Sequence, residues 1–335
     1  MLTEVYIQNY ASIYNAKVQL SPFTLLIGAN GTGKSNFLKL LREISKTQQL
    51  KFKAIGKAFD IKLPAHHSFP DTAQRITLRN DKMSGYSLQR QPPLKEVRYR
   101  EDIQENAQPK TFDAAQISML PEMSDVRIFS LNPQNVGKEE ILEVSPTVRE
   151  DGTGTIQVLD SLKTGDREDL FEKIEQVFKD YIPEVKKLSF IPTTNAKRLQ
   201  IRDINLPNPV LMSELSEGMQ LALILITILH QEKKPSLICI EDIDRGLHPR
   251  LYQQIVELCF DIAEMEGVQI IATTHNPYLV DEFKDNEEAV VIVEKENGQT
   301  KFTTLAERLE QIEPVDEPLG SLWYSGFVGG VPQKA

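Results

Sequence analysis

The sequence has few of the residues that build several common classes of protein. Among 335 residues there are only two cysteines, Cys239 and Cys259, and both lie in apolar stretches. This excludes a disulfide framework and a cysteine-rich zinc site. We expect no secretory leader, because the first residues, MLTEVYIQNYAS, have no basic flank and no long apolar run, and the longest apolar stretch, Met219–Leu229, is too short to cross a bilayer. We therefore expect a cytoplasmic protein that contacts no membrane.

An overall excess of basic charge is also missing. The net charge of -10 disfavours a protein that permanently coats nucleic acid. The charge is uneven, however, because residues 75–100 have a balance of +5 and residues 281–317 a balance of -8. The acidic stretch is expected to be a solvated surface or a docking site for a basic effector. The basic stretch is a candidate contact for DNA or an acidic partner, or else an exposed strand region with solvated charge; its proposed contact residues are Arg75, Arg79, Arg90 and Arg98.

Apolar patterns predict an α/β protein. Alternation over residues 2–9 and 17–20 indicates an antiparallel strand pair, and the apolar run Phe23–Ile27 indicates a strand buried on both faces. A helix is expected from about Asn36 to Thr47. Arg75–Leu78 and Tyr86–Arg90 have the pattern of exposed strands. In the C-terminal third, helices alternate with strands, which predicts a largely parallel sheet; the ranges are 215–229, 237–240, 251–265, 268–273 and 289–294.

A phosphate-binding motif follows the apolar run at 23–27. Residues 28–35 have the sequence GANGTGKS, which fits the pattern G-x-x-x-x-G-K-[ST]. Glycines let the backbone wrap around phosphates, and N–H groups at a helix start hold negative charge. Lys34 is expected to reach the β- and γ-phosphates, and Ser35 to ligate Mg²⁺. The predicted ligand is therefore ATP with Mg²⁺, bound by Gly28, Asn30, Gly31, Thr32, Gly33, Lys34, Ser35 and Asn36.

A second motif combines a short apolar strand with two acids. Residues 237–242 have the sequence LICIED, typical of a Walker B strand. Glu241 is expected to hold Mg²⁺, and Asp242 to polarise the attacking water. Acids after buried strands are often only solvated caps, but a phosphate loop in the same chain favours the catalytic interpretation.

Three further motifs flank these acids. LSEGMQ at 215–220 precedes them, IDRGLHP at 243–249 follows directly, and TTHNP at 273–277 comes after the next predicted strand. In this order the chain resembles ABC-type ATPases. The residues of these motifs are most similar to those of the compact soluble branch of this class. That branch includes RecF, the structural-maintenance-of-chromosomes (SMC) proteins and the overcoming-lysogenization-defect (OLD)-like AAA family ATPases of bacterial defence modules. The resemblance implies an α/β P-loop NTPase fold, an ABC-ATPase head with a mixed or antiparallel first lobe and a helical insertion.

The resemblance also implies roles for single residues. Two subunits of the family pair head to tail around ATP, so a homodimer or a higher oligomer of dimers is expected. The signature residues of one subunit would contact the γ-phosphate held by Lys34 of the other. Ser216 is at the same time a candidate N-cap of its own helix. The residues assigned in this way are Ser216, Glu217 and Gly218 of the signature, Asp244 of the D-loop and the switch histidine His275.

The chain departs from the family pattern at several positions. Asp242 stands where most members have glutamate, Ile243 stands where proline is usual, and the signature is SEGMQ instead of SGGQ. A displacement of about 1 Å at a reacting group can cost roughly a hundredfold in rate. We therefore expect an ATPase that is slow or gated by a partner. The Q-loop is not distinct in the sequence, and Gln134 is its candidate.

One ABC-type head is expected to use the whole chain, 1–335, with segments 1–50, 51–212, 213–294 and 295–335. No heptad pattern between 36 and 212 indicates a coiled-coil arm. The sixty residues after His275 are expected to leave no room for a fused nuclease. The favoured hypothesis is an ATP-hydrolysing switch that controls a separately encoded effector, of nuclease type, in anti-phage defence. The alternative is a RecF-like repair ATPase that binds DNA directly. A subunit of a membrane transporter is disfavoured by the N-terminal sequence that leads into the phosphate loop and by the residues GLHP at 246–249.

Overall fold

The fold is described from a computed structural model, for residues 1–53, 74–80, 85–90, 97–101, 123–141, 143, 146–194 and 196–332. The chain forms two compact units, each discontinuous in sequence. Unit 1 contains Met1–Ile128, Pro235–Cys239 and Ala263–Ala335, and unit 2 contains Phe129–Lys234 and Ile240–Ile262. The stretch 51–212, which was expected to be one insertion lobe, is thus divided between the two units.

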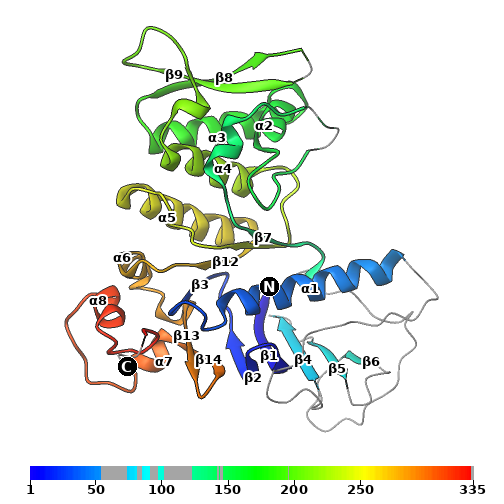
Figure 1. Cartoon of the computed structure of the whole chain (residues 1–335), viewed down its shortest axis with the longest axis vertical. Helices are drawn as coiled ribbons and strands as arrows, with labels where there is room; N and C mark the ends of the chain where they lie inside the picture. The colour runs from blue at the N-terminus through cyan, green and yellow to red at the C-terminus, as the bar shows by residue number, and fades with distance from the viewer. Residues whose placement is uncertain are drawn as a thin grey trace. The chain divides into compact units, whose positions relative to one another are not determined.

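The described part of unit 1 contains two sheets. The first has five antiparallel strands in the order β2-β1-β4-β5-β6 (Figure 1). Their bounds are β1 (Leu2–Tyr10), β2 (Ile13–Gln19), β4 (Gln74–Asn80), β5 (Gly85–Arg90) and β6 (Val97–Glu101). The predicted N-terminal pair is confirmed. The expectation that the strand at 75–78 is exposed is wrong, because Ile76 and Leu78 are fully buried in the core. β6 was not predicted.

The second sheet has six strands in the order β14-β13-β3-β12-β11-β7. β3 pairs in parallel with β12 and with β13, and β13 pairs antiparallel with β14. The sheet is therefore mixed, and β3 has a parallel, hydrogen-bonded neighbour on each side. The bounds are β3 (Phe23–Ile27), β7 (Val126–Phe129), β11 (Leu237–Ile240), β12 (Gln269–Thr273), β13 (Val290–Glu296) and β14 (Gln299–Thr304).

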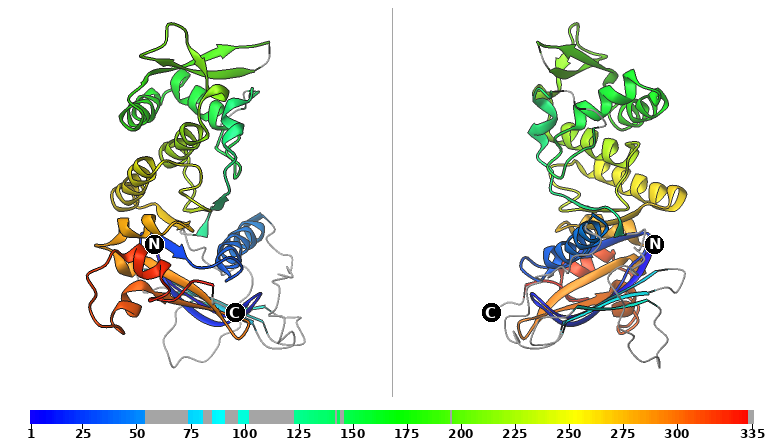
Figure 2. Two further views of the ribbon diagram at one scale, coloured as in Figure 1. Left: turned by 60° about the vertical axis from the view of Figure 1, so that its left-hand side comes forward. Right: turned by 90° about the vertical axis from the view of Figure 1, so that its right-hand side faces the viewer.

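Helix α1 (Lys34–Lys53) shares one apolar core with both sheets. Phe37, Leu41 and Ile44 on this helix are buried with residues such as Val5 of β1 and Leu26 of β3. The helix is longer at both ends than the predicted 36–47. β14 also lies beside β2, so the β1–β2 and β13–β14 hairpins are neighbours (Figure 2). Among the residues described in unit 1, three short α-helices follow later in the chain: α6 (Pro277–Val280), α7 (Leu305–Leu309) and α8 (Leu319–Tyr324).

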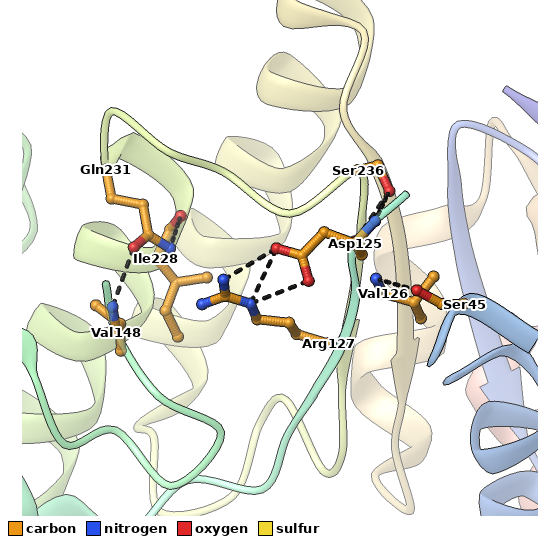
Figure 3. Close-up of polar contacts among 8 residues, drawn as sticks. All are labelled: Ser45, Asp125, Val126, Arg127, Val148, Ile228, Gln231 and Ser236. Carbon is orange, nitrogen blue, oxygen red and sulfur yellow. Dashed lines mark hydrogen bonds and ion pairs between the residues drawn. The ribbon is translucent and has the colours of Figure 1, made fainter. Parts of the chain in front are cut away.

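Polar contacts anchor the start of β7 in unit 1 (Figure 3). The Asp125 N–H donates to Ser236 Oγ, and the Ser236 hydroxyl donates back to the Asp125 carbonyl, both at 2.9 Å. The N–H of Val126 donates to Ser45 Oγ on α1 at 3.2 Å, and Arg127 pairs with the Asp125 carboxylate. These bonds hold β7 beside the segment that leads into β11 and against α1.

Unit 2 consists of helices and a three-stranded antiparallel sheet in the order β10-β9-β8. Helix α3 packs against α2, α4 and β8. Every residue of α4 from Gln220 to His230 is buried, as its apolar sequence predicts. The bounds are α2 (Thr155–Thr164), α3 (Glu168–Tyr181), β8 (Val185–Pro192), β9 (Lys197–Asp203), β10 (Val210–Leu211), α4 (Glu217–His230) and α5 (Pro249–Glu266), whose last turn is counted in unit 1.

None of the helices in the described ranges combines the length and apolar character needed to cross a membrane.

Candidate functional site

The phosphate-binding motif forms the connection between β3 and α1. Gly28 has a φ of +145°, and a Cβ at this position would lie 2.2 Å from the carbonyl oxygen of Val293 in β13. Gly33 has a φ of +118°, and a Cβ there would lie 2.5 Å from Thr300 Oγ1. Gly31 has a φ of +76° but no neighbour within 4 Å. At Gly28 and Gly33 the loop has no space for a side chain, and at all three glycines the positive φ favours glycine.

Lys34 and Ser35 form the first turn of α1. The Lys34 side chain is almost fully buried, and its ammonium donates to the carbonyl oxygens of Gly28 at 2.7 Å and Ala29 at 3.1 Å. Ser35 is exposed. A loop lined by backbone groups, a helix N-terminus and a lysine together fit the phosphates of a nucleotide, and an exposed serine hydroxyl fits Mg²⁺. The residues present therefore suit the predicted MgATP.

His275 lies at the same edge of the sheet as this loop. β12 runs parallel to β3 with Thr273 opposite Leu26, so both strands end at one edge. The exposed His275 follows β12 by two residues. Its neighbours are fixed, because Thr274 Oγ1 accepts from the Asn276 N–H at 3.0 Å and Asn276 caps α6. This placement is consistent with a contact to the γ-phosphate, which stays a prediction.

The two predicted Walker B acids follow β11 and belong to unit 2. The Glu241 N–H donates to the Phe129 carbonyl at 2.8 Å, and its side chain is half-buried. Asp242 is exposed and has a φ of +50°, in the left-handed region. Aspartate and asparagine are enriched several-fold in that region, whereas glutamate is not. The backbone thus gives a physical reason for aspartate where the resemblance implied glutamate.

The signature segment begins α4. Ser216 is the N-cap, and its side chain accepts from the Met219 N–H at 3.3 Å, so the capping role expected for it is confirmed. Glu217 is the first helical residue. A Cβ on Gly218 would lie 2.9 Å from the carbonyl oxygen of Gly246. The signature glycine is therefore required by contact with the loop that contains the predicted D-loop residue Asp244, independently of any nucleotide.

The candidate Q-loop residue Gln134 is exposed in unit 2, at the start of the 3-10 helix Pro133–Gly137, where its N–H donates to Asn132 Oδ1 at 3.1 Å. Its side chain takes no part in this contact.

Sequence reasoning missed Ser12 and Thr300, whose hydroxyl groups contact the phosphate loop and its helix. Among the described residues, no group of three or more His, Cys, Asp and Glu side chains could hold a metal ion by itself.

The predicted basic contact residues lie on two faces of the five-stranded sheet. Arg75 of β4 and Arg98 of β6 are both opposite Gln89 of β5, so they occupy one face. Arg79, four residues after Arg75, is on the same face. Arg90 is on the other face, which contributes to the core. The four arginines were expected to act together, and the strand register separates Arg90 from the rest.

Comparisons with known proteins agree with this architecture. Residues 23–281 match the family model described as "AAA domain, putative AbiEii toxin, Type IV TA system". No curated protein matches the chain in sequence. The structure of an Smc head bound to the C-winged helix domain of ScpA has a TM-score of 0.58 and 14% identity, covering 93% of this chain and 99% of that one. The SMC head domain from Thermotoga maritima has a TM-score of 0.51 and 15% identity, over 90% and 98% of the two chains. The chain thus has the P-loop fold of SMC ATPase heads, as predicted.

Proposed function

The chain belongs to this AAA-domain family, and from that premise we propose that it is an ATP-hydrolysing switch which dimerises head to tail around MgATP. The fold and family support an ATPase of the SMC-head type. The observation that carries the proposal is the phosphate loop, in which crowded glycines, a buried Lys34 and the start of α1 converge at the end of β3.

Within unit 1, each group is assigned one task. Lys34 and the N–H groups of the loop bind the β- and γ-phosphates, and Ser35 ligates Mg²⁺. His275, at the same sheet edge, senses the γ-phosphate. When bound, MgATP supplies the reactive phosphoanhydride bond, which is broken by water.

Within unit 2, the proposal gives the hydrolytic and dimer contacts to two loops. Glu241 holds Mg²⁺, and Asp242 accepts a proton from the attacking water. Ser216 and Gly218 at the start of α4 approach the γ-phosphate bound by the partner subunit. The dipole at this helix N-terminus favours an anion. Because Gly218 leaves no room for a side chain beside the Gly246 carbonyl, the signature and D-loop segments would move together when a dimer closes.

The test measures binding and hydrolysis separately. Asp242→Asn keeps the side-chain shape and the tolerance for a left-handed backbone, but removes the base. We expect it to bind MgATP as wild type does and to hydrolyse it about 10²–10⁴-fold more slowly. Lys34→Ala should lose binding itself. Hydrolysis by Asp242→Asn at the wild-type rate would exclude Asp242 as the base.

The proposed output is control of a separately encoded effector in anti-phage defence. The family description, which refers to a toxin–antitoxin system, supports such a role. The test is phage plating on cells that carry the native gene neighbourhood with wild-type chain, Lys34→Ala or Asp242→Asn. Protection that is present with wild type and lost with Lys34→Ala is expected; equal protection by Lys34→Ala would refute ATP control of the output.

A second candidate function, direct DNA binding of the RecF type, is favoured by one observation. The strand register groups Arg75, Arg79 and Arg98 on a single sheet face. Reversing these three charges should weaken DNA binding and reduce its salt dependence. Each of the three single reversals is compared with Arg90→Glu, which makes the same charge change on the other face. Unchanged DNA affinity in the triple variant would remove this candidate.

A further inference from the structure

We propose that Ser12 and Thr300 are positioning residues for nucleotide binding, because a chain of hydrogen bonds through their hydroxyl groups holds the backbone of the phosphate loop in place. These two residues and their hydrogen bonds are called the clasp. This inference rests on the proposed ATP-binding function. Ser12 lies in the turn between β1 and β2, and Thr300 lies in β14. The two residues are 288 positions apart in the sequence, yet they meet beside residues 32–36.

The contacts form one connected path. Asn36 Nδ2 donates to Ser12 Oγ at 2.9 Å. Ser12 Oγ lies 2.8 Å from Thr300 Oγ1, and Thr300 Oγ1 lies 2.6 Å from the carbonyl oxygen of Thr32. The N–H of Thr300 also donates to the Ser12 carbonyl at 2.8 Å, which fixes the two backbones to each other. Thr32 and Asn36 bracket Lys34 and Ser35, so the path holds both sides of the segment that is assigned to phosphate and Mg²⁺.

The direction of each hydrogen bond follows from the chemistry of the groups. A carbonyl oxygen can only accept, so the single Thr300 hydroxyl proton must point to the carbonyl of Thr32. The contact between the two hydroxyls is then a donation from Ser12 to Thr300. Ser12 Oγ remains an acceptor and receives the amide proton of Asn36. Each hydroxyl donates once and accepts once, and such chains reinforce their members.

Packing makes the clasp specific for this loop conformation. Thr300 is fully buried, and its Oγ1 and Cγ2 lie 2.5 and 2.8 Å from the point where a Cβ of Gly33 would be. The threonine therefore occupies the space that the glycine leaves open. Loss of the hydroxyl would leave the buried Thr32 carbonyl without this donor and allow the backbone between Thr32 and Asn36 to rotate. The N–H groups that hold phosphate would then be less well oriented.

The test compares substitutions that differ by a single group. Thr300→Val keeps the shape and removes the hydroxyl, Thr300→Ser keeps the hydroxyl, and Ser12→Ala breaks the next link. Thr303→Val is the control, because it makes the same change in the same strand away from the loop. Binding is measured with a fluorescent ATP analogue, hydrolysis as kcat and KM, and folding by thermal unfolding.

We expect Thr300→Val and Ser12→Ala to raise the Kd and KM for ATP about tenfold or more, with kcat within about threefold of wild type. Thr300→Ser should rescue the affinity, and Thr303→Val should leave it unchanged. A merely structural role would lower the melting temperature of Thr300→Val without this split between KM and kcat. Equal affinities of wild type and Thr300→Val, or no rescue by Thr300→Ser, would overturn the proposal.

Hydrogen exchange without nucleotide separates this inference from the proposed function. Amides of residues 32–36 should exchange faster in Thr300→Val than in wild type and in Thr303→Val. If wild type bound no ATP, the proposed function would fail, and with it the role in nucleotide binding, whereas the clasp itself would still be judged by these amides. Unchanged exchange in Thr300→Val would overturn the clasp whatever the nucleotide result.

Discussion

The crowding of Gly28 against β13 gives a prediction whose size can be worked from the structure. A Cβ at Gly28 would lie 2.2 Å from the Val293 carbonyl oxygen, whereas real Cβ atoms essentially never come closer than 3.0 Å. β3 and β13 would have to separate by about 1 Å, which weakens roughly two hydrogen bonds of the parallel ladder, each contributing about 1 kcal/mol. The φ of +145° adds about 1–3 kcal/mol of backbone strain for any residue with a side chain.

Gly28→Ala is therefore expected to lower the free energy of unfolding of unit 1 by about 3–5 kcal/mol, or the melting temperature by roughly 6–20 °C. Gly31→Ala is the matched control, because Gly31 also has a positive φ, +76°, but has no neighbour within 4 Å. It should cost only about 1–2 kcal/mol. Thermal unfolding followed by circular dichroism compares the two variants. If Gly28→Ala were no less stable than Gly31→Ala, the close approach of β3 to β13 would be wrong.

Three further substitutions test other parts of the fold. Gly218→Ala should destabilise unit 2 by about 1–2 kcal/mol, since the clash 2.9 Å from the Gly246 carbonyl outweighs the gain in helix propensity; a more stable variant in thermal unfolding would contradict this contact. Burial raises the pKa of Tyr10 to about 12, so its contribution to stability is complete below pH 10 and is lost as the pH rises toward 12; Tyr10→Phe should remove this part of the alkaline loss in denaturant titrations. Burial also raises the pKa of Glu140, although its carboxylate accepts a hydrogen bond from the Gly154 N–H at 2.6 Å. The free energy of unfolding of wild type, relative to that of Glu140→Gln, should therefore fall as the pH rises above about 4.5. If wild type instead gained stability relative to Glu140→Gln with rising pH, the raised pKa would be refuted.

Apolar runs and helical periodicity predicted the elements that the core depends on. β3 and β11 have the predicted bounds, and the helices and strands predicted between 215 and 294 are present in the predicted order. β14 was missed because its sequence, QTKFTT, is mostly polar, as suits a strand at the edge of a sheet. The Asn297–Gly298 turn before it was a usable signal, because both residues have a positive φ and join β13 to β14 directly.

The site was predictable where one short segment carries the chemistry. The phosphate loop could be identified from its glycines and lysine, because each acts on the backbone near it. The contacts of Thr300 with the loop and of Gly218 with Gly246 could not be predicted, since they join segments that are far apart in the chain. The positive φ of Asp242 could not be predicted from the sequence either. It gives a reason for the aspartate, which in the sequence was only a departure from the pattern that the resemblance implied.

The head-to-tail dimer is the central claim, and the mass of Asp242→Asn in solution tests it most directly. Light scattering after size-exclusion chromatography compares the variant without nucleotide, with MgADP and with MgATP. The proposal predicts that the mass doubles only with MgATP, and that adding Ser216→Arg prevents the doubling while the monomer still binds MgATP. If Asp242→Asn bound MgATP and kept the same mass at every protein concentration, an ATP-driven dimer would be contradicted.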